Sequence, residues 1–117
     1  MKQKEKDLLL KDLCARLPYG VIMTNIELPE TYYPLTCGDL HDAMFDDDWD
    51  DVPYLRPMSS MTEEEKVKLS LSQIYAFTHY NEVAKMDWLN EHHFDYRGLI
   101  DKGLAIEVTE DNNPYKD

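Results

Sequence analysis

Residues 87–106 carry the pattern that most restricts how this chain can fold. One helix is predicted over residues 82–93, so that it ends within this block, and a second, short helix is predicted over residues 96–102. Gly103 follows and can take the left-handed conformation that ends a helix, after which residues 104–108 should form a returning strand. The apolar face of the first of these helices would hold Val83, Met86, Leu89 and His93.

The N-terminal segment predicts one amphipathic helix. Apolar residues recur at three- and four-residue spacing over residues 3–17, and Pro18 and Gly20 then end the periodic run. The predicted buried face holds Leu9, Leu10, Leu13, Cys14 and Leu17. The predicted polar face holds Lys6, Lys11, Asp12 and Arg16.

The next part of the chain predicts strands. Residues 20–26 are rich in β-branched side chains and residues 32–37 begin with two tyrosines, which indicates a hairpin with its turn at Pro29 and Glu30. Residues 40–45 and 52–55 are predicted as a third and a fourth short strand. The expected result is a small, curved antiparallel sheet of three to four strands.

A capped helix is predicted after residue 60. Ser60 with Glu63, and Thr62 with Glu65, both have the spacing of a capping box. Residues 67–78 fit helical spacing through Val67, Leu71, Ile74 and Thr78. They also fit strand alternation through Val67, Leu69, Leu71 and Tyr75. The strong cap favours the helix.

These elements predict an α+β fold with an N-terminal helix, a small sheet and a helical C-terminal half with one returning strand. A chain of 117 residues is most simply a single domain over residues 1–117. Residues 109–117 are polar and contain Pro114, so they are predicted to be a frayed tail.

The charge is strongly negative and unevenly placed. The net charge is −12, but residues 1–16 carry +2, so the remainder carries −14. Such a surface repels phosphate groups, which argues against direct binding to DNA or RNA. It suits solubility, a basic protein partner or divalent cations.

The sequence also predicts the compartment. No apolar run approaches the length of a membrane span, and the chain opens with lysines rather than with an apolar signal segment. Cys14 and Cys37 have no CxxC spacing. We therefore expect a cytoplasmic protein with reduced thiols, no membrane contact and no cofactor.

An acidic run is the most obvious candidate site. It consists of Asp46, Asp47, Asp48, Trp49, Asp50 and Asp51, with Asp39 and Asp42 upstream. One hypothesis is a protein-docking surface around Trp49, because tryptophan is a frequent anchor at interfaces. A second is a divalent-metal site made by Asp46, Asp48, Asp50 and His41, since hard cations prefer oxygen ligands. A third is a solvated loop without a partner.

The metal hypothesis departs from the known calcium-loop pattern. Asp46, Asp48 and Asp50 match the first, third and fifth positions of an EF-hand loop. The sixth position is Asp51 instead of glycine, and the twelfth is Pro57 instead of glutamate.

No catalytic residue is predicted. The sequence holds no GxSxG, HExxH, GxGxxG or GxxxxGK motif. His92 and His93 are adjacent, so they would point about 100° apart on a helix and could not share one metal. Trp88 and Arg97 remain candidates for protein contact, because Trp88 falls off the predicted apolar stripe.

Three segments resemble a known group of proteins. They are LCARLPYGV over residues 13–21, YLRPMSSMTEEE over residues 54–65, and the block DWLNEHHFDYRGLIDKGLAI over residues 87–106. Together they resemble small uncharacterised proteins encoded mostly in bacteriophage and prophage-like regions of gut bacteria. The resemblance implies an accessory protein of a mobile element in the bacterial cytoplasm, and it implies no activity, cofactor or catalytic residue.

The leading functional hypothesis is a non-enzymatic, acidic protein-binding accessory protein. The alternative is a metal-dependent enzyme or a divalent-metal-binding protein that uses the carboxylates between Asp39 and Asp51. A further alternative is a nucleic-acid mimic, whose carboxylates would replace phosphates on one continuous face.

Overall fold

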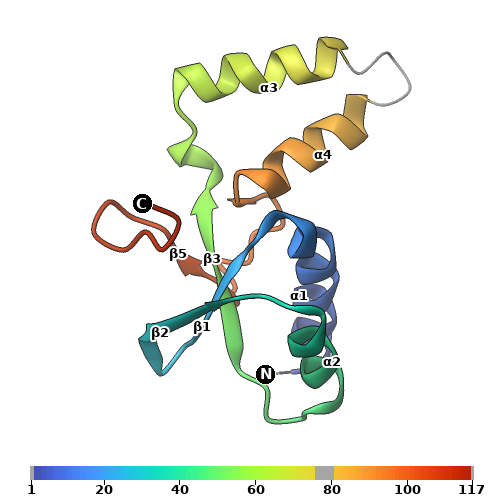
Figure 1. Ribbon diagram of the computed structural model, residues 1–117, viewed down its shortest axis with the longest axis vertical. Coiled ribbons are helices and arrows are strands. Elements are labelled where there is room, and N and C mark those ends of the chain that lie inside the picture. Colours follow the sequence, from blue (N-terminus) through green and yellow to red (C-terminus); the bar gives the residue numbers. More distant parts are fainter. Residues whose placement is uncertain (1, 76–80, 117) are drawn as a thin grey trace.

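Strand β3 (Asp51–Pro57) lies at the centre of a mixed sheet in the computed structural model, which describes residues 2–75 and 81–116 (Figure 1). Strand β1 (Ile22–Asn25) pairs antiparallel with β3 and with β2 (Leu28–Pro34). Two short strands, β4 (Phe94–Asp95) and β5 (Ile106–Glu107), pair parallel with the second half of β3. The sheet is therefore antiparallel only in its N-terminal part, where the sequence predicted it.

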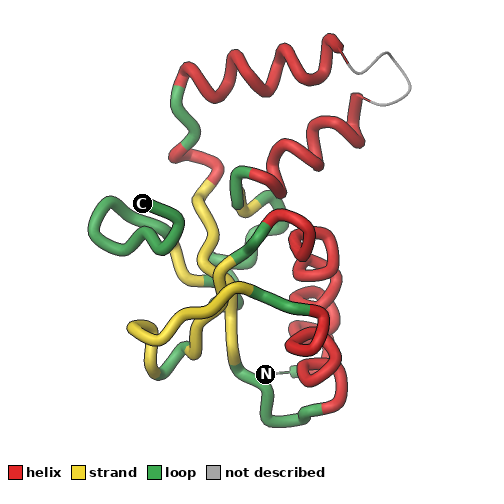
Figure 2. The backbone as a smooth tube through the Cα atoms, viewed as in Figure 1, coloured by secondary structure: helices red, strands yellow, loops and turns green. Residues whose placement is uncertain are grey.

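Two helices cover one side of the sheet. Helix α1 (Gln3–Arg16) and helix α2 (Cys37–Phe45) pack side by side there, as Figure 2 shows with helices in red and strands in yellow. Leu9 and Leu13 of α1 enter the core with Val21, Met23 and Leu55 of the sheet region. The predicted N-terminal helix and the α+β class are confirmed.

The other two helices form an antiparallel pair that extends away from the sheet. Helix α3 (Glu63–Tyr75) follows a short 3-10 turn (Met58–Ser60), and helix α4 (Asn81–Glu91) returns toward the sheet (Figure 1). A second apolar cluster of Trp88, Leu89 and Phe94 holds the base of the pair. Part of the segment predicted as helix or strand, including Thr78, lies outside the described residues.

The cap of α3 is the second of the two predicted capping boxes. Glu65 N–H donates to Thr62 Oγ1 at 3.1 Å, and Thr62 N–H donates to Glu65 Oε1 at 3.0 Å. Ser60 instead donates its hydroxyl to the Pro57 carbonyl. The same cap resolves the ambiguity in favour of helix as far as Tyr75.

Residues 40–45 are the last six residues of α2, so the predicted third strand is wrong. Thr36 and Asp39 make a capping box, in which Asp39 N–H donates to Thr36 Oγ1 at 3.2 Å and Thr36 N–H donates to Asp39 Oδ2 at 2.9 Å. Leu40 and Ala43 then bury one face of the helix at three-residue spacing. The strand prediction overlooked this cap.

The hairpin between β1 and β2 turns earlier than predicted. Ile26 and Glu27 form the turn, where Glu27 N–H donates to Asn25 Oδ1 at 2.9 Å. Pro29 and Glu30, the predicted turn, lie within β2. The asparagine side chain supplies the local hydrogen bond that starts the reversal.

Residues 96–98 are irregular and residues 99–102 form turns, so the short helix predicted over residues 96–102 is wrong. Gly98 has φ of +73°, which a right-handed helix does not accommodate. The Asp95 carboxylate accepts N–H bonds from Leu99 and Ile100, both at 2.9 Å. These side-chain bonds replace a helical ladder. Gly103 does take the positive φ expected of it, but it follows a turn.

The buried faces of three helices, α4, α1 and α3, differ from the predicted ones. Helix α4 ends at Glu91, because His93 lies beyond it with φ of +64°, and Val83 is 55% exposed. Cys14 is exposed on α1, whereas Asp12 and Arg16 are fully buried. On α3, Leu69 packs inward while Val67 and Leu71 are exposed.

The C-terminal segment, residues 109–116, is bonded to the sheet through the side chain of Tyr115. Tyr115 Oη donates to the Tyr54 carbonyl at 2.7 Å and accepts from Ile22 N–H at 2.9 Å. The β1–β3 ladder ends at the pair Met23 and Pro53, so the hydroxyl bridges the two strands just beyond it. The prediction of a frayed tail took no account of this tyrosine.

Candidate functional site

The C-terminal end of α2 presents two large apolar side chains to solvent. Phe45 is 74% exposed and Met44 is 59% exposed. Phe45 follows the buried Ala43 by two positions, so it projects about 160° around the helix from it. The His41 ring lies against Phe45, with 4.9 Å between the ring centroids. The helix cap and the buried Leu40 thus fix Phe45 on the outside.

Aspartates surround this end of the helix. Asp42 precedes Phe45 on α2, and Asp46, Asp47 and Asp48 follow it in the exposed loop to β3. Asp48 N–H donates to Asp46 Oδ1 at 2.9 Å, which fixes the local turn. We call Met44, Phe45 and these four aspartates the Phe45 surface.

The negative charge of this region is not balanced by ion pairs. Within residues 2–75 and 81–116, no lysine or arginine forms a salt bridge to Asp42 or to any aspartate of residues 46–51. The ammonium group of Lys6 donates to the main-chain carbonyl of Asp46 at 2.7 Å. The C-terminal end of a helix already carries partial negative charge, so the added carboxylates cost stability there.

Asp50 and Asp51 face the sheet instead. Asn25 Nδ2 donates to Asp50 Oδ1 at 2.8 Å and to Asp51 Oδ1 at 3.0 Å. Tyr33 Oη donates to Asp51 Oδ2 at 2.6 Å. Burial first, and then this bond to Asp51, raise the pKa of the Tyr33 hydroxyl. These two aspartates therefore attach the end of the acidic loop to β1 and β2.

Trp49, the predicted anchor for a partner, packs inward. Its indole N–H donates to the Asp51 carbonyl at 3.2 Å, and its ring contacts the core cluster under α1. The exposed aromatic of this region is Phe45, which the sequence reasoning missed because it assigned residues 40–45 to a strand. The capping box formed by Thr36 and Asp39 is the signal that would have found it.

The structure does not gather the candidate metal ligands. Among the described residues, no three histidine, cysteine, aspartate or glutamate side chains lie close enough together to hold an ion. His41 Nδ1 lies 3.9 Å from Asp42, and both side chains are exposed. The Asp50 carboxylate accepts from Asn25 Nδ2, whereas the Asp46 carboxylate accepts from Asp48 N–H.

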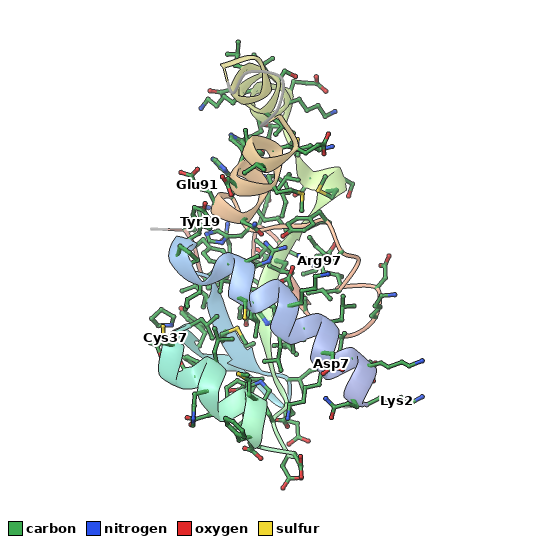
Figure 3. The ribbon with its side chains drawn as sticks, turned by 90° about the vertical axis from the view of Figure 1, so that its right-hand side faces the viewer. Lys2, Asp7, Tyr19, Cys37, Glu91 and Arg97 are labelled. Atoms are coloured by element: carbon green, nitrogen blue, oxygen red, sulfur yellow. The ribbon has the colours of Figure 1, made fainter. Side chains whose placement is uncertain are left out.

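Trp88 and Arg97 lie in the interior network of the fold. Trp88 is 8% exposed and stacks between His92 and Phe94, with centroid distances of 4.0 and 5.8 Å. Arg97 lies beside α1 (Figure 3), where its Nε–H donates to Asp12 at 3.1 Å. Both side chains have structural contacts that account for them.

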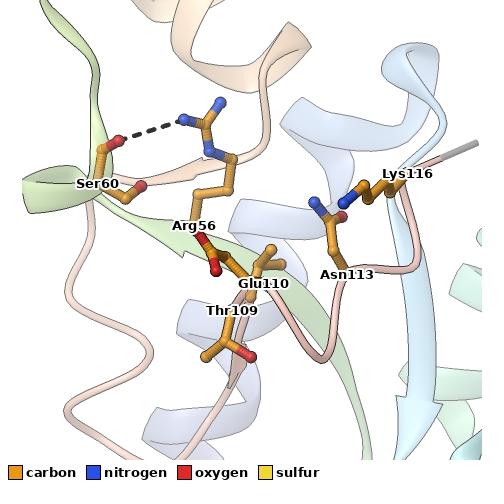
Figure 4. A pocket seen from close by; sticks show the side chains of 7 residues that line it. Arg56, Ser60, Thr109, Glu110, Asn113 and Lys116 are labelled. Carbon is orange, nitrogen blue, oxygen red and sulfur yellow. Dashed lines mark hydrogen bonds between the residues drawn. The ribbon is translucent and has the colours of Figure 1, made fainter.

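A cleft of about 530 Å³ lies between β3 and the C-terminal segment (Figure 4). Arg56, Thr109, Asn113 and Lys116 line it. The Arg56 guanidinium is already paired with Glu65 through two bonds of 2.6 and 2.7 Å. Because Arg56 donates to it, the pKa of Glu65 falls to about 2. The arginine is therefore not free to bind an anion in this cleft.

The acidic groups occupy separate parts of the molecule. Glu63, Glu64 and Glu65 begin α3, which lies at the opposite end of the molecule from α2 (Figure 1). Lys66 and Lys68 form ion pairs with Glu63 and Glu64. Among the described residues, lysines or arginines pair with the glutamates of residues 63–65 but not with the aspartates of residues 46–51.

Comparison of the chain with protein-family models, with curated proteins and with solved structures finds no match. Within the described parts of the chain, no helix is both long enough and apolar enough to cross a membrane.

Proposed function

We propose that this chain is a non-enzymatic binding protein whose Phe45 surface docks on a basic protein. The observation that carries the proposal is the exposure of Phe45, at 74%, among aspartates that no lysine or arginine of the described residues pairs with. A large aromatic surrounded by charge can fill an apolar pocket while the rim pairs with lysine or arginine on the partner.

The energetics of the surface support binding rather than a role in folding. An exposed phenylalanine gains little from burial within its own chain, whereas covering it would contribute about 2 kcal/mol. The aspartates repel one another and the helix terminus, and a cationic partner would relieve that repulsion. Covering Phe45 and the aspartates with a complementary surface would therefore lower the free energy of the complex.

The resemblance of three segments to phage and prophage proteins supports a setting for this activity. It leads us to propose an accessory protein of a phage or other mobile element in the bacterial cytoplasm, acting on a host-encoded or element-encoded protein. The unpaired acidic charge would speed encounter with a basic target at low salt.

Affinity capture with matched variants tests the proposal. Wild-type protein on beads should retain a basic protein from bacterial lysate at low salt and release it near 1 M salt, where the screening length is about 3 Å. Retention should fall with F45A and with D46N/D47N/D48N, and it should survive in E63Q/E64Q/D111N, which removes the same charge from exposed positions elsewhere.

Two results would contradict this function. One is equal retention by D46N/D47N/D48N and by its charge-matched control, which would make the charge non-specific. The other is that the retained proteins are DNA-binding proteins and that both triple variants reduce their retention equally. This result would favour the nucleic-acid mimic.

A further inference from the structure

Lys6 is a buried lysine that contacts the main chain of the Phe45 surface. The sequence placed it on the polar face of α1, but in the structure it is only 8% exposed. Its ammonium group donates to the Asp46 carbonyl at 2.7 Å, and within residues 2–75 and 81–116 it forms no ion pair. A buried ammonium of this kind needs other negative groups nearby. The C-terminal end of α2 and its aspartates supply them.

Asp46, the residue that Lys6 contacts, determines the shape of the end of α2. Its backbone leaves the helical conformation with φ of −101° and ψ of 108°. Its N–H donates to the Asp42 carbonyl at 2.9 Å, and its carbonyl accepts Trp49 N–H at 3.2 Å in addition to the Lys6 ammonium. Its carboxylate accepts Asp48 N–H at 2.9 Å. Of these four bonds, the one from Lys6 is the one that comes from another helix.

The bond from Lys6 therefore attaches the last turn of α2 to α1. The final carbonyls of a helix lack partners within the helix, and short helices fray at their ends. Phe45 directly precedes Asp46 in the chain, and Asp47 directly follows it. Fixing the Asp46 carbonyl thus limits the directions in which the exposed phenylalanine and the aspartates can point.

We propose that Lys6 is a positioning residue for the Phe45 surface, because it holds that surface in the arrangement that a basic partner recognises. The inference rests on the proposed function, since the arrangement matters for binding only if the surface binds. Lys6 is buried and acts through Asp46 rather than by touching the partner. A surface that is ordered before binding loses less conformational entropy in the complex.

Charge and positioning predict effects of opposite sign when Lys6 is replaced. K6M makes the chain more negative by one charge, which by electrostatics alone should strengthen attraction to a basic partner. Loss of positioning should weaken binding instead. K11M makes the same change in charge at an exposed position of the same helix and is the matched control. The difference between K6M and K11M therefore separates the two effects.

Binding is measured by fluorescence anisotropy with a labelled synthetic peptide of alternating lysine and leucine as the probe. K6M should bind this peptide about tenfold more weakly than K11M does. K6R keeps a cationic donor and should recover part of that loss. Equal binding by K6M and K11M would overturn the proposal. If neither the wild type nor K11M binds the peptide, that result counts against the proposed function, and hydrogen exchange then decides the role of Lys6.

Hydrogen exchange tests the positioning without a partner. In K6M the amides of Asp46 and Trp49 should exchange about tenfold faster than in the wild type. The Leu35 amide, which donates to the Val21 carbonyl at 3.0 Å, should keep its rate. Unchanged rates at Asp46 and Trp49 would overturn the proposal. Equal acceleration at all three amides would also overturn it, because Lys6 would then contribute only to global stability.

A measurement on the wild type covers the case in which K6M does not fold. The ammonium protons of Lys6 should exchange with water slowly enough to give a separate signal in proton–nitrogen spectra, whereas those of the exposed Lys11 should not. If Lys6 exchanges as fast as Lys11, its ammonium does not hold the Asp46 carbonyl and the proposal is wrong.

Discussion

Arg97 donates its Nε–H to the carboxylate of Asp12 at 3.1 Å, although 85 residues separate them in the sequence. The other oxygen of the same carboxylate accepts Nε–H of Arg16 at 2.6 Å. Asp12, which is fully buried, thus joins helix α1 to the segment that follows β4. A buried ion pair of this kind is costly to form but much more costly to break on one side.

Replacing Asp12 with asparagine should destabilise the fold strongly. The amide keeps the shape but leaves the buried Arg16 charge uncompensated, so we expect a loss of about 3–5 kcal/mol in the free energy of unfolding. Chemical denaturation measures it. R97Q should cost about 1 kcal/mol, since Arg97 is partly exposed. Equal effects of the two variants would contradict the central role of the Asp12–Arg16 pair.

Removing the hydroxyl of Tyr115 should loosen the end of the β1–β3 ladder. Y115F keeps the ring on His93 but leaves Ile22 N–H and the Tyr54 carbonyl without this bridge. We expect a loss of about 1–3 kcal/mol and faster hydrogen exchange at the Ile22 amide. The control is Y32F, because Tyr32 is 57% exposed. An unchanged exchange rate at Ile22 would rule out the bridge.

The partly buried His93 should make stability fall in acid. Its pKa is lowered from 6.5 to about 4, chiefly by burial, so the unfolded chain binds the proton more readily. Stability from this group is complete above pH 6.5 and is lost as the pH falls toward 4, by up to about 1.4 kcal/mol per pH unit.

The comparison with H93N isolates this effect, since asparagine tolerates the positive φ at this position. The unfolding free energy of wild type minus that of H93N should decline between pH 6.5 and 4. A constant difference over that interval would show that His93 is not held neutral.

Glu65 should keep its charge well into the acidic range. The bonds from Arg56 come first among the causes that lower its pKa from 4.5 to about 2. Its contribution is complete above pH 4.5 and is lost as the pH falls toward 2. The carboxyl carbon signal of Glu65 should titrate near 2, and in R56Q it should move toward the ordinary value. A midpoint near 4.5 in the wild type would contradict the pairing.

Local signals in the sequence predicted much of the fold. The apolar spacing identified α1, the Thr62–Glu65 cap identified α3, and the β-branched residues identified β1. The α+β class followed from these elements. The short cap at Thr36 was overlooked, so α2 was predicted as a strand.

The remaining differences come from long-range contacts. The burial of Asp12 and Arg16 depends on Phe94 and Arg97, which no local pattern connects to α1. The turns after Asp95 depend on its side chain bonding two main-chain amides. The sequence identified the acidic run but not the exposed aromatic beside it. In the structure Trp49 packs against the core, whereas Phe45 at the end of α2 is exposed.

Site-specific photo-crosslinking tests the central claim most directly. With p-benzoylphenylalanine in place of Phe45, irradiation in bacterial cells should attach a basic protein to the chain. The D46N/D47N/D48N background should abolish that adduct, and the same probe at the exposed Val67 should not form it. If position 45 gives no adduct, or the same adduct forms at position 67 regardless of the aspartates, the Phe45 surface is not a docking site.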